Sequence, residues 1–83
     1  MNLAQKVGTI SHYFSNIGVA VVELSNTLKV GDNIQIKGFT TDFTIAVSSM
    51  QIEHKAVQEA KAGQSIGMKV PGAVRQGDSV YKI

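Results

Sequence analysis

Apolar and polar residues alternate along much of this chain, which is the pattern of β-strands with one buried face. The segment Asn33–Lys37 shows the alternation most clearly, because Ile34 and Ile36 stand between polar neighbours. Alternation and β-branched residues, interrupted by polar or Pro–Gly breaks, predict six strands. Their predicted bounds are Lys6–Phe14, Ile17–Leu24, Asn33–Lys37, Phe43–Ile52, Gln64–Val70 and Asp78–Ile83.

Two of these strands depart from simple alternation. Ile17–Leu24 is apolar on both faces, so we expect it to be a central strand with Val21 in the core. In Phe43–Ile52 the apolar phase slips at Ser48–Ser49, which predicts a β-bulge at a barrel corner. Glu53–Ala62 is the one stretch that would hold a helical turn, and it is too short for a stable independent helix.

A short pattern occurs three times: a basic residue, any residue, glycine, Asp or Gln, a polar residue, and then Ile or Val. It begins at Lys29, Lys61 and Arg75. Glycine adopts a positive φ without steric cost, and the polar side chain after it can bond nearby backbone. The pattern therefore predicts a tight turn that leads into a strand. Three such turns in 83 residues predict a small all-β barrel, closed or nearly closed.

Length and composition narrow the choice further. The 83 residues form a single predicted domain, 1–83, with a loose tail at 1–5. The chain has no cysteine, which excludes disulfides and thiolate metal sites, and its net charge of +2 is only mildly basic. The longest apolar run, Ile17–Val22, is far shorter than the roughly 20 residues of a membrane helix, and the N-terminus lacks the apolar region of a signal peptide. We therefore expect a cytoplasmic protein with no membrane partner.

Several passages taken together suggest a family. Leu28–Ile36, Met50–Ile52, Glu59–Met68 and Arg75–Val80 resemble, in order and approximate spacing, domain 2 of Tu-type translation elongation factors. The likeness covers about residues 7–83 and implies a six- to seven-stranded Greek-key β-barrel that contacts tRNA or ribosomal RNA. A second, weaker resemblance is to the small C-terminal barrel of some collagenase-like peptidases.

The chain departs from the elongation factors at two points. Their Gly-Arg-Gly turn, which lies near the aminoacyl acceptor end, is matched here by Ser15–Val19, which has no arginine. This departure argues against acceptor-end binding. No phosphate-binding loop of the Gly-x-x-x-x-Gly-Lys-Ser/Thr type occurs in the chain, so we expect it neither to bind nor to hydrolyse nucleoside triphosphates.

Three consecutive ring side chains, His12, Tyr13 and Phe14, form one candidate binding site. Neighbours on a strand face opposite ways, so either Tyr13, or His12 with Phe14, should be partly exposed. Exposed rings can stack on unpaired bases. The alternative is a barrel end cap with one surface tyrosine.

Basic residues near predicted strand ends form a second candidate site. If they share one rim of the barrel, they would make a patch that contacts phosphates. Because acidic residues are interleaved among them, a solvated surface is the alternative. The candidate rim residues are Lys29, Lys37, Lys55, Lys61 and Arg75.

Catalysis and metal binding have little support in the residue inventory. His12 and His54 are the only histidines, whereas a zinc site needs three or four ligands. The six acidic residues are scattered, and the serines lie where turns and strands ordinarily have them. We expect no catalytic residue, no metal and no cofactor.

The sequence thus predicts a non-catalytic binding module, with RNA or a translation-related assembly as its partner. The alternative is a protein-interaction module that serves as the accessory subunit of an enzyme on another chain. An apolar surface patch in place of a positive rim would favour this alternative.

Overall fold

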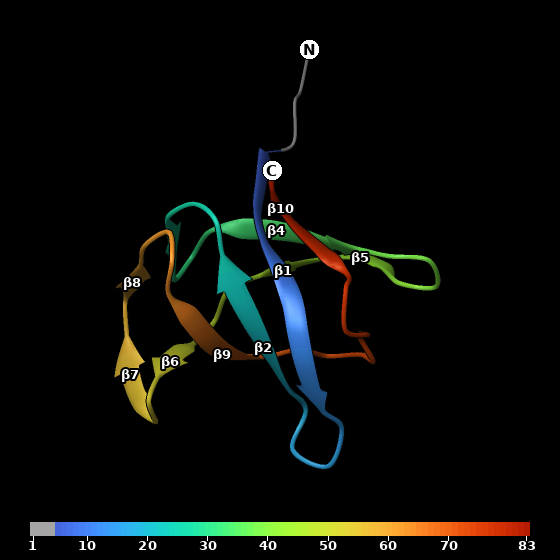
Figure 1. Ribbon diagram of the computed structural model, residues 1–83, viewed down its shortest axis with the longest axis horizontal. Coiled ribbons are helices and arrows are strands. Elements are labelled where there is room, and N and C mark those ends of the chain that lie inside the picture. The colour runs from blue at the N-terminus through green and yellow to red at the C-terminus, as the bar shows by residue number, and fades with distance from the viewer. Residues whose placement is uncertain (1–4) are drawn as a thin grey trace.

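The computed structural model describes residues 5–83 and arranges them as β-strands joined by turns (Figure 1). The strands, in chain order, are β1 Gln5–Phe14, β2 Val19–Leu24, β3 Leu28–Lys29, β4 Asn33–Lys37, β5 Asp42–Ala46, β6 Met50–Ile52, β7 Lys55–Val57, β8 Glu59–Ala60, β9 Ser65–Lys69 and β10 Ser79–Lys82. The predicted all-β class is confirmed.

Eight strands form one antiparallel sheet in the order β5-β4-β10-β1-β2-β9-β6-β7, and β3 pairs with β8 in a separate short ribbon. The sheet curls strongly around its concave face (Figure 1). Within the described part of the chain, no pairing joins the two outermost strands, β5 and β7. The domain is therefore an open half-barrel, and the predicted closed six- to seven-stranded Greek-key barrel is wrong.

The sheet stays open because the chain changes partner between β5 and β6. Residues 47–49 form no strand; β5 pairs with β4, whereas β6 pairs with β7 and touches β9 at one position. The phase slip at Ser48–Ser49 marks this change of partner and not the predicted bulge. Register irregularities lie instead in β1, at Lys6–Gly8 and Ile10–His12.

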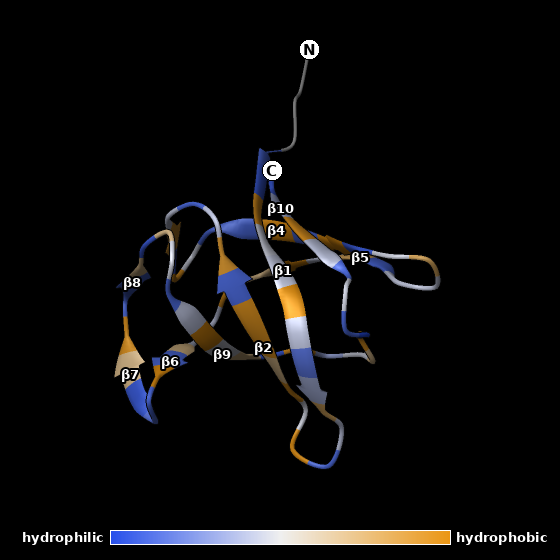
Figure 2. Cartoon of the chain, in the orientation of Figure 1, coloured by the Kyte–Doolittle hydropathy of each residue, from blue (hydrophilic) through white to orange (hydrophobic). Residues whose placement is uncertain are grey.

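The core fills the concave side of the sheet. Ile34 and Ile36 are fully buried, as their alternation predicted. β2 pairs with β1 and β9 and is central, as predicted, and it is apolar along most of its length (Figure 2). Its buried residues, however, are Ala20, Val22 and Leu24, and Val21 is only half-buried on the opposite face. The prediction of Val21 as a core residue is wrong, because the apolar outer face of β2 belongs to a surface groove.

The predicted turn occurs at all three places. The glycine has a positive φ each time: +97° at Gly31, +89° at Gly63 and +96° at Gly77. A backbone N–H before the glycine donates to the side chain after it, from Lys29 to Asp32 Oδ2 (2.9 Å), from Lys61 to Gln64 Oε1 (2.8 Å) and from Arg75 to Asp78 Oδ2 (2.9 Å). Each side chain thus supplies an acceptor that fixes the turn before the chain continues.

The structure differs from the prediction at Glu53–Ala62 and describes part of the predicted N-terminal tail. Glu53–Ala62 holds no helical turn: it contains β7 and β8, preceded by a tight turn at Glu53 and His54. Of the predicted loose tail, residues 1–4 lie outside the described residues, and Gln5 begins β1. Among residues 5–83, no helix has the length and apolar character needed to span a membrane.

Candidate functional site

An apolar groove crosses the outer face of the sheet, between the tip of the β1–β2 hairpin and the β6–β7 hairpin. Its volume is about 290 Å³. The residues that line it are Phe14, Ile17, Val19, Val21, Gln51, Glu53, His54, Ser65, Ile66 and Gly67. Apolar side chains from β1, β2 and β9 and from the turn between β1 and β2 gather in it.

The floor of the groove follows from the alternation of β2. Because Ala20 and Val22 face the core, Val19 and Val21 must face outward. Gly67 of β9 pairs with Val21 on one side and with Gln51 of β6 on the other. Gly67 has no side chain, so the middle of the floor stays low, and a Cβ there would already contact Val19 Cγ1 at 3.4 Å.

One wall is the turn between β1 and β2. The N–H groups of Ile17 and Gly18 both donate to the carbonyl oxygen of Phe14, at 3.2 and 2.9 Å, which closes the turn. Phe14 is 42% exposed and Ile17 57% exposed. The His12 ring packs beside Phe14, with centroids 4.4 Å apart. Two large apolar side chains are thereby held in solvent at a hairpin tip, where burial against another surface would stabilise them.

The opposite wall is a strained turn. Ile52 pairs with Lys55 across the two residues Glu53 and His54, whose φ angles are +51° and +66°. A two-residue hairpin turn with positive φ at both positions is usually built from Asn and Gly, since other side chains pay a steric cost there. Residues held in such conformations cluster at functional sites. The strain therefore points to the same groove.

The structure separates the three predicted stacking residues. His12 and Phe14 are exposed and contact each other on one face of β1, whereas Tyr13 is half-buried and packs against the core. Of the two arrangements that strand alternation allowed, the structure adopts the one with His12 and Phe14 outside. Phe14 belongs to the groove; Tyr13 does not.

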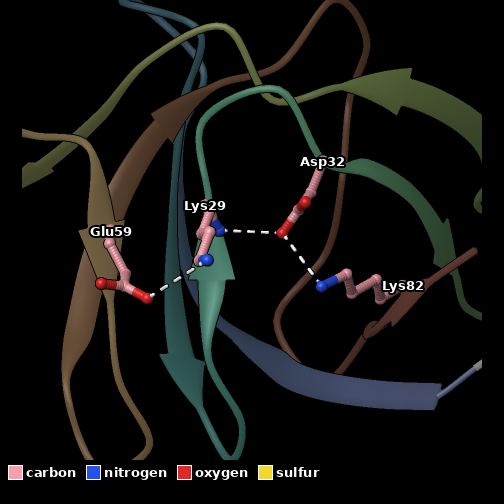
Figure 3. Close-up of polar contacts among 4 residues, drawn as sticks. All are labelled: Lys29, Asp32, Glu59 and Lys82. Atoms are coloured by element: carbon pink, nitrogen blue, oxygen red, sulfur yellow. Dashed lines mark hydrogen bonds and ion pairs between the residues drawn. The ribbon is translucent and has the colours of Figure 1, made fainter.

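The five predicted rim residues lie at separate places on the fold. Lys29 and Lys61 flank the β3–β8 ribbon, Lys37 and Arg75 lie near the opposite end of β4, and Lys55 begins β7. The Lys29 ammonium is 3.8 Å from Glu59 Oε2, and Asp32 beside it pairs with Lys82 at 3.4 Å (Figure 3). Acidic groups thus accompany the basic ones at the ribbon.

The groove contains no arrangement typical of a catalytic site. Among residues 5–83, no hydrogen bond joins a serine hydroxyl to a histidine ring, and no three His, Asp or Glu side chains gather as metal ligands. Its floor is apolar, and a carboxylate and an imidazole lie at one rim. That combination suits contact with another macromolecular surface.

The sequence interpretation missed most of the groove. The sequence pattern predicts a strand covered on both faces for Ile17, Val19 and Val21, and a helical turn for the segment that holds Glu53 and His54. One signal was present in the sequence: β2 is apolar on both faces in a domain too small to cover both. A central strand of that kind leaves one apolar face for a partner.

The sequence has relatives among uncharacterized archaeal proteins. An uncharacterized protease of Methanocaldococcus jannaschii is 43% identical over 77 residues, which are 92% of this chain and 19% of the relative. An uncharacterized protein of the same organism is 37% identical over 67 residues, 76% of this chain and 21% of that protein. The chain thus spans about a fifth of the length of the curated relatives it matches. A comparison with protein-family models finds no match.

Solved structures share the fold. The C-terminal domain of a Geobacillus thermoleovorans protein described as a U32 peptidase superposes with a TM-score of 0.89, at 21% identity, over 95% of this chain and 92% of that domain. A selenomethionine variant of the same domain gives a TM-score of 0.90 at 21% identity, over 94% of this chain and 99% of that domain. At this identity the likeness establishes the half-barrel fold.

These comparisons correct the predicted family and function. The relatives and structural neighbours are proteins named as a protease or as the C-terminal domain of a peptidase, so the predicted kinship with domain 2 of elongation factors is wrong. The predicted role in RNA or translation binding is wrong with it. The motifs that suggested it, above all the three Gly turns, are devices of small β-barrels in general and carry no ligand information.

Proposed function

We propose that this chain is a non-catalytic, protease-associated domain that docks through its outer groove onto the catalytic part of a U32-type peptidase. The observation that carries the proposal is that this chain matches a small part of a protein named as a protease, while an apolar groove lies exposed on its surface. A 43% identical segment makes up only 19% of a protein named as a protease. In that relative, about four fifths of the chain lies outside the match, with room for the catalytic machinery.

The exposed side chains support docking through the groove. Phe14 and Ile17 stand in solvent at the hairpin tip, and the half-buried Val19 and Val21 lie between them and the second wall. A contiguous apolar surface on a small domain is typical of an interface. The Glu53 and His54 side chains at the rim supply polar contacts around the apolar centre, which is the usual anatomy of a protein–protein contact.

The experiment replaces the matching segment of the M. jannaschii protease with this chain and measures the release of fragments from casein. We expect the graft to cleave casein as the intact relative does, a deletion of the segment to cleave it poorly, and this chain alone to release nothing. Phe14→Ser with Ile17→Ser in the graft should lower the activity toward that of the deletion.

A matched control is Phe39→Ser, which removes a fully exposed aromatic side chain from the β4–β5 turn, outside the groove. This variant should leave the graft as active as before. Casein cleavage by the isolated chain, or a deletion as active as the intact relative, would show that the domain is not an accessory to catalysis carried elsewhere.

A further inference from the structure

The sheet formed by residues 5–83 ends at β5, whose outer edge has no strand of the described chain beside it. Two hydrogen bonds flank β5 and set the phase of its ladder with β4. Before β5, the N–H of Gly38 donates to the carbonyl oxygen of Thr41 at 2.7 Å. After β5, the N–H of Val47 donates to the carbonyl oxygen of Asp32 at 2.9 Å. Thr41 and Val47 are an even number of residues apart, so both fall in the hydrogen-bonded phase of an antiparallel pair.

The phase identifies the backbone groups that point away from β4. Phe43 and Ile45 share the phase of the flanking bonds, so their N–H and C=O groups face β4. Those of Asp42, Thr44 and Ala46 point to the free edge. Within residues 5–83, β5 has β4 as its only neighbour in the sheet. The edge thus presents three residues whose donors and acceptors are arranged to pair with another strand.

A cavity opens beside this edge. Its volume is about 380 Å³, and it lies between the end of β5 and the end of β9. The lining residues are Ile45, Ala46 and Ser48 on one side and Lys69, Val70 and Pro71 on the other. The apolar side chains of Ile45 and Val70 lie on its two sides, and the exposed Lys69 lies at the same site.

The other outermost strand is protected in ways that β5 is not. β7 has only three residues, begins with Lys55, and follows a turn with two left-handed residues. Short length, lysine and local twist are the usual means of blocking an edge. β5 has five residues with neither Lys nor Pro, and its one charge, Asp42, is held by the Gln35 side chain at 2.8 Å.

We propose that the free edge of β5 binds an extended polypeptide segment of another protein, which adds as a strand, places an apolar side chain in the cavity and a carboxylate beside Lys69. Alternating N–H and C=O groups along an exposed edge, which otherwise bond to water, match those of another extended chain. Among the described residues Lys69 has no ion-pair partner, and it is the only charged residue lining the cavity, so the complementary group is an anion. The carboxylate would come from an acidic side chain or from the C-terminus of the segment.

A second copy of this chain is a poorer occupant. Its own β5 would be the strand it offers, and the Phe43 and Ile45 side chains of that strand already pack against its core. The remaining side chains are those of Asp42, Thr44 and Ala46, which are polar or small. A self-paired edge would therefore leave the cavity empty. The edge site is distinct from the outer groove and does not depend on the groove's role.

The test is an NMR titration of the ¹⁵N-labelled chain with three libraries of short peptides that carry Val, Leu or Ile at alternate positions. One library ends in a free carboxylate, one is amidated and contains Glu, and one is amidated and uncharged. The amide signals of Asp42, Thr44 and Ala46 should shift with all three libraries, and at a lower peptide concentration with the two libraries that carry a carboxylate. The same peptides N-methylated at alternate amides should lose the effect.

Two pairs of variants separate the contributions. Thr44→Pro removes a donor from the free edge while leaving the β4 ladder intact, and should abolish the shifts, whereas Thr44→Val should keep them. Lys69→Gln should weaken binding of the carboxylate peptides by about two- to five-fold, as an exposed ion pair does, and leave the uncharged peptides unaffected. A thermal melt of each variant confirms folding.

Shifts confined to Phe14, Ile17 or His54 would move peptide binding to the groove and overturn the edge site, as would no shift with any library. Concentration-dependent broadening of the β5 amides without peptide, together with a dimer in sedimentation, would make a second copy the occupant and likewise overturn it. Docking onto a peptidase is tested separately, by the graft.

Discussion

The buried carboxylate of Asp78 lies against the backbone of Gly38, in the space that a Cβ on residue 38 would occupy. The same carboxylate accepts a hydrogen bond from the N–H of Arg75 at 2.9 Å. The third Gly turn therefore packs against the residue that follows β4. This contact supports the pairing of β10 with β4, and β4 in turn pairs with β5. A side chain at residue 38 would force these elements apart.

Gly38→Ala should lower the free energy of unfolding by about 1–3 kcal/mol, the usual cost of overpacking. Urea unfolding followed by circular dichroism measures it. Gly72→Ala is the matched control, because its Cβ would meet Phe43 at an ordinary 3.9 Å. Equal stability of the two variants would show that Asp78 moves aside without cost.

When the side chain that follows a turn glycine is removed, the loss in the free energy of unfolding should be larger the more buried that side chain is. Asp78 is 5% exposed, whereas Gln64 lies in solvent. Asp78→Ala should cost roughly 2 kcal/mol, since it removes a hydrogen bond to a charged group. Asp78→Asn, which retains an acceptor, should cost less, and Gln64→Ala least of all. Chemical denaturation of the three variants gives the ranking, and a Gln64→Ala as destabilised as Asp78→Ala would contradict it.

The two faces of β2 should respond differently to charge. Val22→Asp places a carboxylate in the core and should unfold a domain whose total stability is of the order of 5 kcal/mol. Val21→Asp places it in the groove, at a half-buried position, and should leave a cooperative thermal transition. Loss of that transition in Val21→Asp would mean that the outer face of β2 is as enclosed as the inner one.

The strained turn at Glu53 and His54 should lower the stability of the domain and contribute to docking. Replacing Glu53 with Asn and His54 with Gly supplies the residues that the positive φ angles favour, and should stabilise the isolated domain by about 1–2 kcal/mol. The same double variant removes both rim side chains, so the graft that carries it should lose casein-cleaving activity. A higher melting temperature without loss of activity would leave the turn with no part in docking.

The strands and turns could be predicted because they depend on local chemistry. Ile34 and Ile36 alternate with polar residues, and Gly31 needs a positive φ wherever its turn is placed. Whether the barrel closes could not be predicted, because the phase slip at Ser48–Ser49 is compatible with a bulge or with a change of the neighbouring strand. Only the long-range pairing of β5 and β6 decides between them.

The candidate site was harder to predict for a related reason. The rings at residues 12–14 form a cluster in the sequence, yet of the three only Phe14 lines the groove. Val21 resembles a core residue in sequence, and its place outside depends on which side of the sheet the chain covers. Lys29 looks free in sequence, and the β3–β8 pairing places its ammonium beside Glu59. Each of these outcomes depends on contacts between residues far apart in the chain.

The central claim is that the groove is covered by the catalytic part of a peptidase. Amide hydrogen exchange tests it most directly, by comparing this chain alone with the same chain grafted into the M. jannaschii protease. We expect exchange to slow in the graft at residues 14–19 and 52–55, the two walls of the groove, and to remain unchanged at the β4–β5 turn. Equal exchange at both walls in the free and grafted chain would contradict the claim.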